Sequence, residues 1–339
     1  MTRFSILDQL PVFRGQDGAD AVRASINLAR LADRRGYHRF WVAEHHGDAA
    51  SACASPELLV SAILRETSRL RVGSGGVLLP YYSPLKVAEN FRMLEALNPG
   101  RVDLGLGRGP GAGPQLRRLL HPAAGEVNDR AYLDQIGTLL ELLDCAPRRP
   151  EHLSIRAVPE VDTAPEVWLL GGGPNSGRLA GFLGVRYCFA HFINPQFAVE
   201  AVATYRRCFR PSPTLSRPYA ALGVRVAAAD DGDLAELIAR QFWMKVTQKR
   251  QATPQSPEAA PDALPSLDDA RRHRRHHGSI DLPAAQLDLL VSGPTRQVAH
   301  RLLALAKQSD VDELFLTMAC SDPELRASAY DGLMEPVGR

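Results

Sequence analysis

Hydrophobic positions fall into short apolar runs separated by longer amphipathic stretches, and this alternation repeats along most of the 339-residue chain. Short apolar runs bounded by turn residues predict strands, and apolar residues that recur at helical spacing predict helices. Between the first two runs, the stretch from about residue 20 to 35 has helical spacing and stops at Gly36. The eight predicted strands lie at residues 4–10, 37–44, 71–80, 101–107, 166–172, 185–191, 219–229 and 312–319.

A helix is predicted after nearly every one of these strands. Ser55-Pro56 is one of the starts, with a serine that can cap and a proline suited to the first turn, and Ser83-Pro84 is another. Strands that alternate with helices pair in parallel through right-handed crossovers. Eight such units favour a closed (β/α)8 TIM barrel over an open doubly wound sheet. We therefore expect one α/β domain over residues 1–339.

Residues 249–285, just before the last strand, break this rhythm. They are rich in proline, alanine and charge and poor in large apolar residues. The segment is too long for an ordinary connection. We predict a flexible insertion that acts as a lid over the barrel mouth. Its run Arg271–His277 is interpreted as a solvated helix face, because no aromatic or carboxylate partners accompany it as a metal or nucleic-acid site requires.

Composition and charge exclude several function classes. A hydrophobic content of 45% can build a substantial core, and a net charge of +2 gives no broad basic field for nucleic acid. The five scattered cysteines form no C-x-x-C pair, so we expect neither a disulfide framework nor a metal site. No stretch approaches the ~18 apolar residues of a membrane span, and the start of the chain lacks the apolar core of a signal peptide. We expect a cytoplasmic protein with no membrane partner.

The candidate chemistry begins at "WVAEHHG", residues 41–47, where an apolar run ends in a carboxylate and two imidazoles. Neighbouring strand residues point to opposite faces, so His45 and His46 cannot both enter one pocket. A neutral imidazole can donate or accept a proton near pH 7. Glu44 can orient an imidazole or pair with an arginine.

Further unusual residues follow the later strands. They occur in "VGSGGVLLPYYSPLKVAENFRMLEAL", "PGRVDLGLGRGPG" and "WLLGGGPNSGRLAGFLG". Together with "AEHH", these blocks resemble the bacterial-luciferase-like flavin-dependent monooxygenase family. The resemblance runs from Phe4 to about Leu333 and is weakest in the insertion.

This resemblance implies a TIM-type barrel that binds FMN at the carboxyl ends of its strands, commonly as a homodimer. A separate NAD(P)H-dependent flavin reductase often supplies the reduced FMN. The flavin then reacts with O2 at its C4a carbon, and the peroxide oxidises a small organic substrate. The sequence leaves hydroxylation, Baeyer–Villiger insertion and aldehyde oxidation open.

The resemblance also assigns roles to individual residues. It places His45 beside the isoalloxazine ring as the catalytic residue and leaves His46 a structural role. It implies a cis peptide between Gly75 and Gly76 that supports the ring, and a plain trans bulge is the alternative. Arg108 is expected to bind the FMN phosphate, because a forked guanidinium forms paired charge-assisted bonds, and a surface ion pair is the alternative.

The remaining predicted cofactor contacts surround the strand ends. The helix start in "GGGPNS" offers N–H groups to a phosphate. Here the chain departs from the family, because glycines at Gly172 and Gly173 replace side-chain donors, while Ser176 retains a hydroxyl. The other predicted contacts are Leu7 and Leu170, as an apolar floor, and Glu44. Aromatic residues such as Tyr81, Tyr82, Trp168, Phe189, Phe192 and Trp243 are weaker candidates for a substrate pocket.

Two other functions stay open at this point. One is a deazaflavin-dependent oxidoreductase on the same barrel, in which hydride transfer replaces oxygen activation. The other is a non-catalytic flavin-binding partner subunit. The "AEHH" pair favours the oxygenase over the deazaflavin enzyme. His45 argues against the non-catalytic subunit, whereas the glycines at the phosphate end argue for that subunit.

Overall fold

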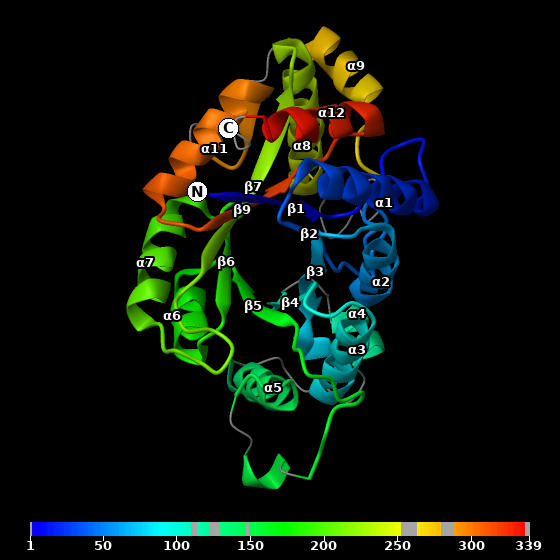
Figure 1. Ribbon diagram of the computed structural model, residues 1–339. Helices are drawn as coiled ribbons and strands as arrows, with labels where there is room; N and C mark the ends of the chain where they lie inside the picture. The colour runs from blue at the N-terminus through cyan, green and yellow to red at the C-terminus, as the bar shows by residue number, and fades with distance from the viewer. Residues whose placement is uncertain are drawn as a thin grey trace.

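The computed structural model describes residues 2–109, 114–121, 129–146, 149–152, 154–251, 263–278 and 288–335. Eight parallel strands form a closed barrel, because β6 pairs with both β5 and β7. Figure 1 shows this ring with the helices outside it. The predicted TIM barrel is confirmed. Its strands are β1 (Arg3–Asp8), β2 (Arg39–Val42), β3 (Arg71–Leu78), β4 (Val102–Gly107), β5 (Glu166–Gly171), β6 (Arg186–Ala190), β7 (Ala220–Ala229) and β9 (Glu313–Thr317).

One further strand, β8 (Val291–Pro294), lies outside the barrel and was not predicted. It pairs with the last residues of β7, from Val226 to Ala229, beyond the part of β7 that pairs with β9. Four residues that include glycine and proline carry too little apolar pattern to predict a strand from sequence.

The helices that cover the barrel begin and end at recognisable residues. Ser83 opens α3 as expected, and it caps the helix by accepting the N–H of Lys86. Ser55 precedes α2 with proline in the first turn, but the expected side-chain cap bond is not formed. The helices are α1 (Gly18–Arg35), α2 (Pro56–Glu66), α3 (Pro84–Leu97), α4 (Pro114–Leu120), α5 (Asp129–Leu142), α6 (Pro174–Leu183), α7 (Ala198–Cys208), α8 (Gly232–Gln251), α9 (Leu267–His277), α11 (Thr295–Gln308) and α12 (Pro323–Leu333).

The barrel interior is filled in two layers. At the amino ends of the strands, buried Arg39 bonds Asp103 at 2.8 Å and Glu313 at 3.2 Å. Above it, the Trp41 ring stacks on Phe315 with centroids 3.8 Å apart and meets Trp168 edge-on at 5.0 Å. These layers close the barrel at the amino ends of its strands, so a ligand can enter the interior only from the carboxyl ends.

Of the predicted insertion, residues 249–251 end helix α8, and residues 263–278 are folded onto the barrel. Ser266 and Asp269 form a capping box at the start of α9. Leu264 exchanges backbone bonds with Val12 and Arg14, and buried Arg240 of α8 donates to the Gly278 carbonyl. The expected helix over Arg271–His277 is confirmed. A lid role for residues 249–285 as a whole stays a prediction, because 252–262 and 279–287 lie outside the described residues.

Three other observations bear on the sequence predictions. No helix among the described residues is long and apolar enough to cross a membrane. The described residues contain no group of three or more His, Cys, Asp or Glu side chains that could hold a metal ion. All five cysteines are free thiols.

Candidate functional site

Three cavities meet at the carboxyl ends of the barrel strands. The strand-tip cavity, of about 640 Å³, includes the tips of β1 to β6 in its walls. The α6 cavity, of about 730 Å³, adjoins it and shares Arg108, Leu170, Gly171 and Gly172. The mouth cavity, of about 150 Å³, shares Gln9 and His45 with the strand-tip cavity.

Every residue predicted to contact a cofactor or to act in catalysis lines the strand-tip or the α6 cavity. The strand-tip cavity includes Leu7, Glu44, His45, Gly75, Gly76, Arg108, Leu170 and Gly172. The α6 cavity adds Gly173 and Ser176. His45 and Arg108 therefore face one continuous space, although they are 63 positions apart in the chain. Their roles toward a cofactor stay predictions.

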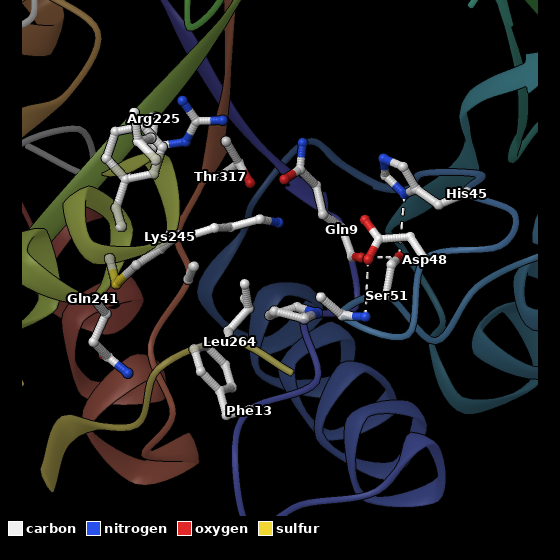
Figure 2. A pocket seen from close by; sticks show the side chains of 16 residues that line it. Gln9, Phe13, His45, Asp48, Ser51, Arg225, Gln241, Lys245, Leu264 and Thr317 are labelled. Carbon is white, nitrogen blue, oxygen red and sulfur yellow. Dashed lines mark hydrogen bonds between the residues drawn. The ribbon is translucent and has the colours of Figure 1, made fainter. Parts of the chain in front are cut away.

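A hydroxyl fixes the orientation of the His45 imidazole. Ser51 Oγ donates to the Gln9 carbonyl at 2.9 Å and lies 3.2 Å from His45 Nδ1 (Figure 2). A hydroxyl has one proton to donate, so Ser51 can only accept from His45. Nδ1 therefore carries a proton, and in the neutral imidazole the lone pair is on Nε2. This tautomer gives the cavity wall a proton acceptor.

Glu44 is held by protein groups on both carboxylate oxygens. Its Oε1 lies 2.7 Å from His46 Nε2 and accepts from Tyr82 at 2.8 Å, and its Oε2 accepts the Leu78 N–H at 3.0 Å. Of the two roles left open for Glu44, the structure shows the first: it orients an imidazole, that of His46. Burial raises the pKa of this carboxyl, while the three bonds act in the opposite direction. His46 has the structural place expected for it.

Gly75 and Gly76 form a bare backbone surface on the cavity wall. The peptide between them is cis, as expected, and the register of β3 against β4 shifts at this point. A Cβ on Gly75 would stand 2.7 Å from Leu7 Cδ1, and one on Gly76 would stand 2.6 Å from the Gly105 carbonyl oxygen. Any larger residue would therefore displace its neighbours in the cavity wall.

Arg108 forms the surface ion pair that was the alternative for it, and its phosphate role stays a prediction. Its guanidinium pairs with Asp129 of α5 at 2.7 Å, and its side chain is 56% exposed. It also lines both adjoining cavities. An exposed pair of this kind is weak, so the guanidinium can exchange Asp129 for a bound anion at little cost.

The start of α6 offers fewer side-chain donors than expected. Gly173 is its N-cap, and no side chain caps the helix. The Ser176 hydroxyl donates to the Gly173 carbonyl at 2.6 Å and also bonds Tyr187 at 2.7 Å. The hydroxyl is thus already bonded within the protein, which leaves backbone N–H groups, Asn175 and Arg178 as further donors lining this cavity.

Sequence reasoning missed several cavity residues. Trp41 and Ala43 alternate with His45 along β2, so period-two spacing could have found them. Phe192 was a weak candidate and does line the strand-tip cavity, whereas Trp168 and Phe189 are fully buried. Gln9, Arg178 and Arg225 carry no sequence signal that separates them from surface residues.

Comparison with known proteins identifies the family. The model of the luciferase-like monooxygenase family matches residues 2–313. The chain belongs to this family. It is 38% identical over 336 residues to YwcH of Bacillus subtilis (strain 168), an uncharacterized protein, with 99% of each chain covered. It is 33% identical to a luciferase-like monooxygenase of Escherichia coli (strain K12), covering 98% of this chain and 96% of that one.

A relative with an assigned activity matches a shorter region. The N-acetyl-S-alkylcysteine monooxygenase of Bacillus subtilis (strain 168) is 40% identical over 210 residues, 62% of each chain. The expectation of an enzyme in the monooxygenase class is confirmed at the level of the family.

Solved structures agree on the barrel and differ in cofactor. Apo-MsnO8 superposes with a TM-score of 0.91 at 35% identity, covering 100% of this chain and 99% of that one. Two more distant structures share the fold with TM-scores of 0.70. One is the oxygenating constituent of 3,6-diketocamphane monooxygenase of Pseudomonas putida in complex with FMN, at 18% identity with 99% of this chain and 98% of that chain covered. The other is an F420-dependent secondary alcohol dehydrogenase, at 16% with 100% and 99% covered.

Proposed function

We propose that this protein is an FMN-dependent monooxygenase that uses reduced FMN and O2 to oxidise a small organic molecule. The observation that carries the proposal is the strand-tip cavity, in which His45 and Arg108 face one space across the bare backbone of Gly75 and Gly76. The family of the chain supports the reaction class.

The cavity residues fit a flavin in shape and charge. The two glycines leave room for a flat ring against the backbone, over an apolar floor of Leu7 and Leu170. At the other end, Arg108 and the N–H groups at the start of α6 would hold the phosphate. Reduced FMN, when bound, supplies the electrons that activate O2.

The protein's own part in the reaction is positioning, proton handling and exclusion of water. His45 presents an acceptor nitrogen, kept in place by Ser51. Phe192, Ile193 and Leu78 add apolar surface around the same space. A hydrogen-bonded reactive oxygen survives longer where water is excluded.

The test is rapid mixing of the reduced-FMN complex with O2, in the absence of substrate. In the unchanged protein, the oxidised flavin spectrum should return only after a delay. His45→Ala should accelerate its return on the order of tenfold or more, equivalent to about 1.4 kcal/mol, with release of hydrogen peroxide. Ser51→Ala should act in the same direction to a smaller extent, because it removes only the bond that orients the ring.

His300→Ala is the matched control, because His300 is exposed on α11. It should leave the delay unchanged. An equal delay in His45→Ala, with FMN still bound, would remove His45 from the mechanism. A complete absence of delay in the unchanged protein would contradict the oxygenase itself.

A deazaflavin-dependent oxidoreductase is the second candidate. It is supported by the F420-dependent secondary alcohol dehydrogenase that shares the barrel at 16% identity. It would bind F420 in preference to FMN and consume no O2. Comparing the two cofactors in the same mixing experiment separates the proposals.

For the substrate, we propose that N-acetyl-S-alkylcysteines be tested first. The 40% identical relative is named for such a substrate. We further propose that a separate flavin reductase supplies reduced FMN and that the protein is a homodimer, as expected from the family resemblance.

A further inference from the structure

The mouth cavity lies next to the strand-tip cavity and shares His45 and Gln9 with it. Its volume of about 150 Å³ is close to that of an engineered apolar cavity that binds benzene. Phe13, Leu264 and Met318 contribute apolar surface. A small ligand in this cavity would therefore reach the wall that carries the candidate catalytic histidine.

Arg225 is the unusual residue of this cavity. It lies on β7 opposite Thr317 of β9, and its guanidinium sits 5.1 Å from the Phe192 ring and 4.3 Å from the Phe242 ring. Nη1 donates to the Phe192 carbonyl at 3.3 Å, and no carboxylate among the described residues forms an ion pair with it. Burial lowers the pKa of Arg225 to about 10. The side chain is still protonated at pH 7.

A half-buried cation of this kind is costly unless an anion faces it. The two phenyl rings cover the flat guanidinium and leave its edge for hydrogen bonding. The planar fork of donors matches a carboxylate better than a spherical ion. The edge of Arg225 is therefore suited to a bound carboxylate.

Charge is divided between opposite walls of the mouth cavity. Arg225 and Lys245 lie on the β7–α8 side, and Asp48 lies on the side of His45, where it accepts the Ala50 N–H (Figure 2). An acid in this cavity would place its carboxylate toward Arg225 and away from Asp48. The rest of the molecule would then extend toward His45.

We propose that the mouth cavity is the substrate pocket and that Arg225 binds the carboxylate of a small organic acid. The carboxylate site stands on the geometry alone, and only its designation as the substrate site rests on the proposed monooxygenase function. Arg225 selects and orients the acid, and His45 lies beside its other end.

Hexanoate and hexanamide test the site, because they match in size and differ in charge. Titration calorimetry on the protein without flavin should show at least tenfold tighter binding of hexanoate. Arg225→Met should remove this preference, because it weakens the binding of hexanoate and leaves the binding of hexanamide unchanged. Lys245→Met should weaken the binding of hexanoate less than Arg225→Met does. Circular dichroism and a thermal melt establish that each variant is folded.

Arg225→Lys covers the case in which the methionine variant does not fold. Lysine keeps the positive charge and loses the planar pair of guanidinium donors, so this variant should retain only part of the preference for hexanoate. Equal binding of both probes by the unchanged protein, no binding of either, or an unchanged preference in a folded Arg225 variant would overturn the proposal. Since no flavin or O2 is present, these outcomes are independent of those that test the monooxygenase.

Discussion

At the scale of residues, the site depends on which atoms each side chain can still offer. His45 and His46 are neighbours, yet one lines the cavity and the other bonds Glu44 and Tyr82. The alternation of strand side chains predicted that they would separate. Only the contacts with Ser51 and Glu44 show how each ring is held. Arg225 was missed because its isolation from carboxylates is a property of three-dimensional neighbours.

Gly76→Ala tests the close approach at the cavity wall. The added Cβ would stand 2.6 Å from the Gly105 carbonyl oxygen and 2.7 Å from Leu170. We expect a loss of about 1–3 kcal/mol in the free energy of unfolding, measured by urea denaturation, together with weaker FMN binding. Gly232→Ala is the control, because a Cβ there meets nothing within 4 Å and Gly232 lines none of the three cavities. Equal stability of the two variants would contradict the packing argument.

At the scale of elements, strands were easier to predict than what lies around them. All eight barrel strands were found because each is a dense apolar run. β8 and the anchoring of α9 were not, since they depend on pairing with β7 and on bonds from α8. The ion cluster below the aromatic layer was also missed, because its members come from separate strands.

Arg39→Met tests that cluster. Arg39 of β2 is 2% exposed and pairs with Asp103 of β4 and Glu313 of β9, which are both fully buried. Removing the cation leaves buried Glu313 without an ion-pair partner and Asp103 with Arg71 alone, so the free energy of unfolding should fall by about 3–5 kcal/mol. The control Arg30→Met breaks an exposed pair with Glu66, for which we expect about 0–1 kcal/mol. Denaturation curves measure both, and a loss for Arg39 no larger than the control would refute the argument.

At the scale of the whole molecule, barrel closure brings the tips of β1 to β6 to one opening. Residues from Leu7 to Ser176 thereby surround two adjoining cavities. The same closure buries titratable groups at the opposite end, so the stability of the whole fold depends on pH.

His38 gives that dependence a defined sign. Burial, then the charges of Arg39 and Arg3, lower the pKa of its imidazole to about 3. The unfolded chain binds a proton near pH 6.5, whereas the folded chain does not. Stability contributed by neutral His38 is therefore present above pH 6.5 and is lost as the pH falls toward 3.

The measurement is the urea midpoint from pH 7.5 to pH 4.5. The unchanged protein should lose stability across this range, and His38→Gln should give a flatter curve, because it keeps an acceptor for Arg3 and cannot titrate. If the urea midpoint falls with pH equally steeply in both proteins, His38 is excluded as the source of the pH dependence.

The sequence by itself determined the barrel, the tips that carry chemistry and the family, because apolar periodicity and local motifs follow from neighbouring residues. It also determined the glycines, whose bare backbone no other residue can provide. Only the tertiary structure decided which partner each polar group has. Arg108 with Asp129 and Arg225 with two phenyl rings are contacts between separate segments, and His45 meets Ser51 through the fold of the loop between them. Such contacts depend on how the barrel closes, and no local pattern in the chain encodes them.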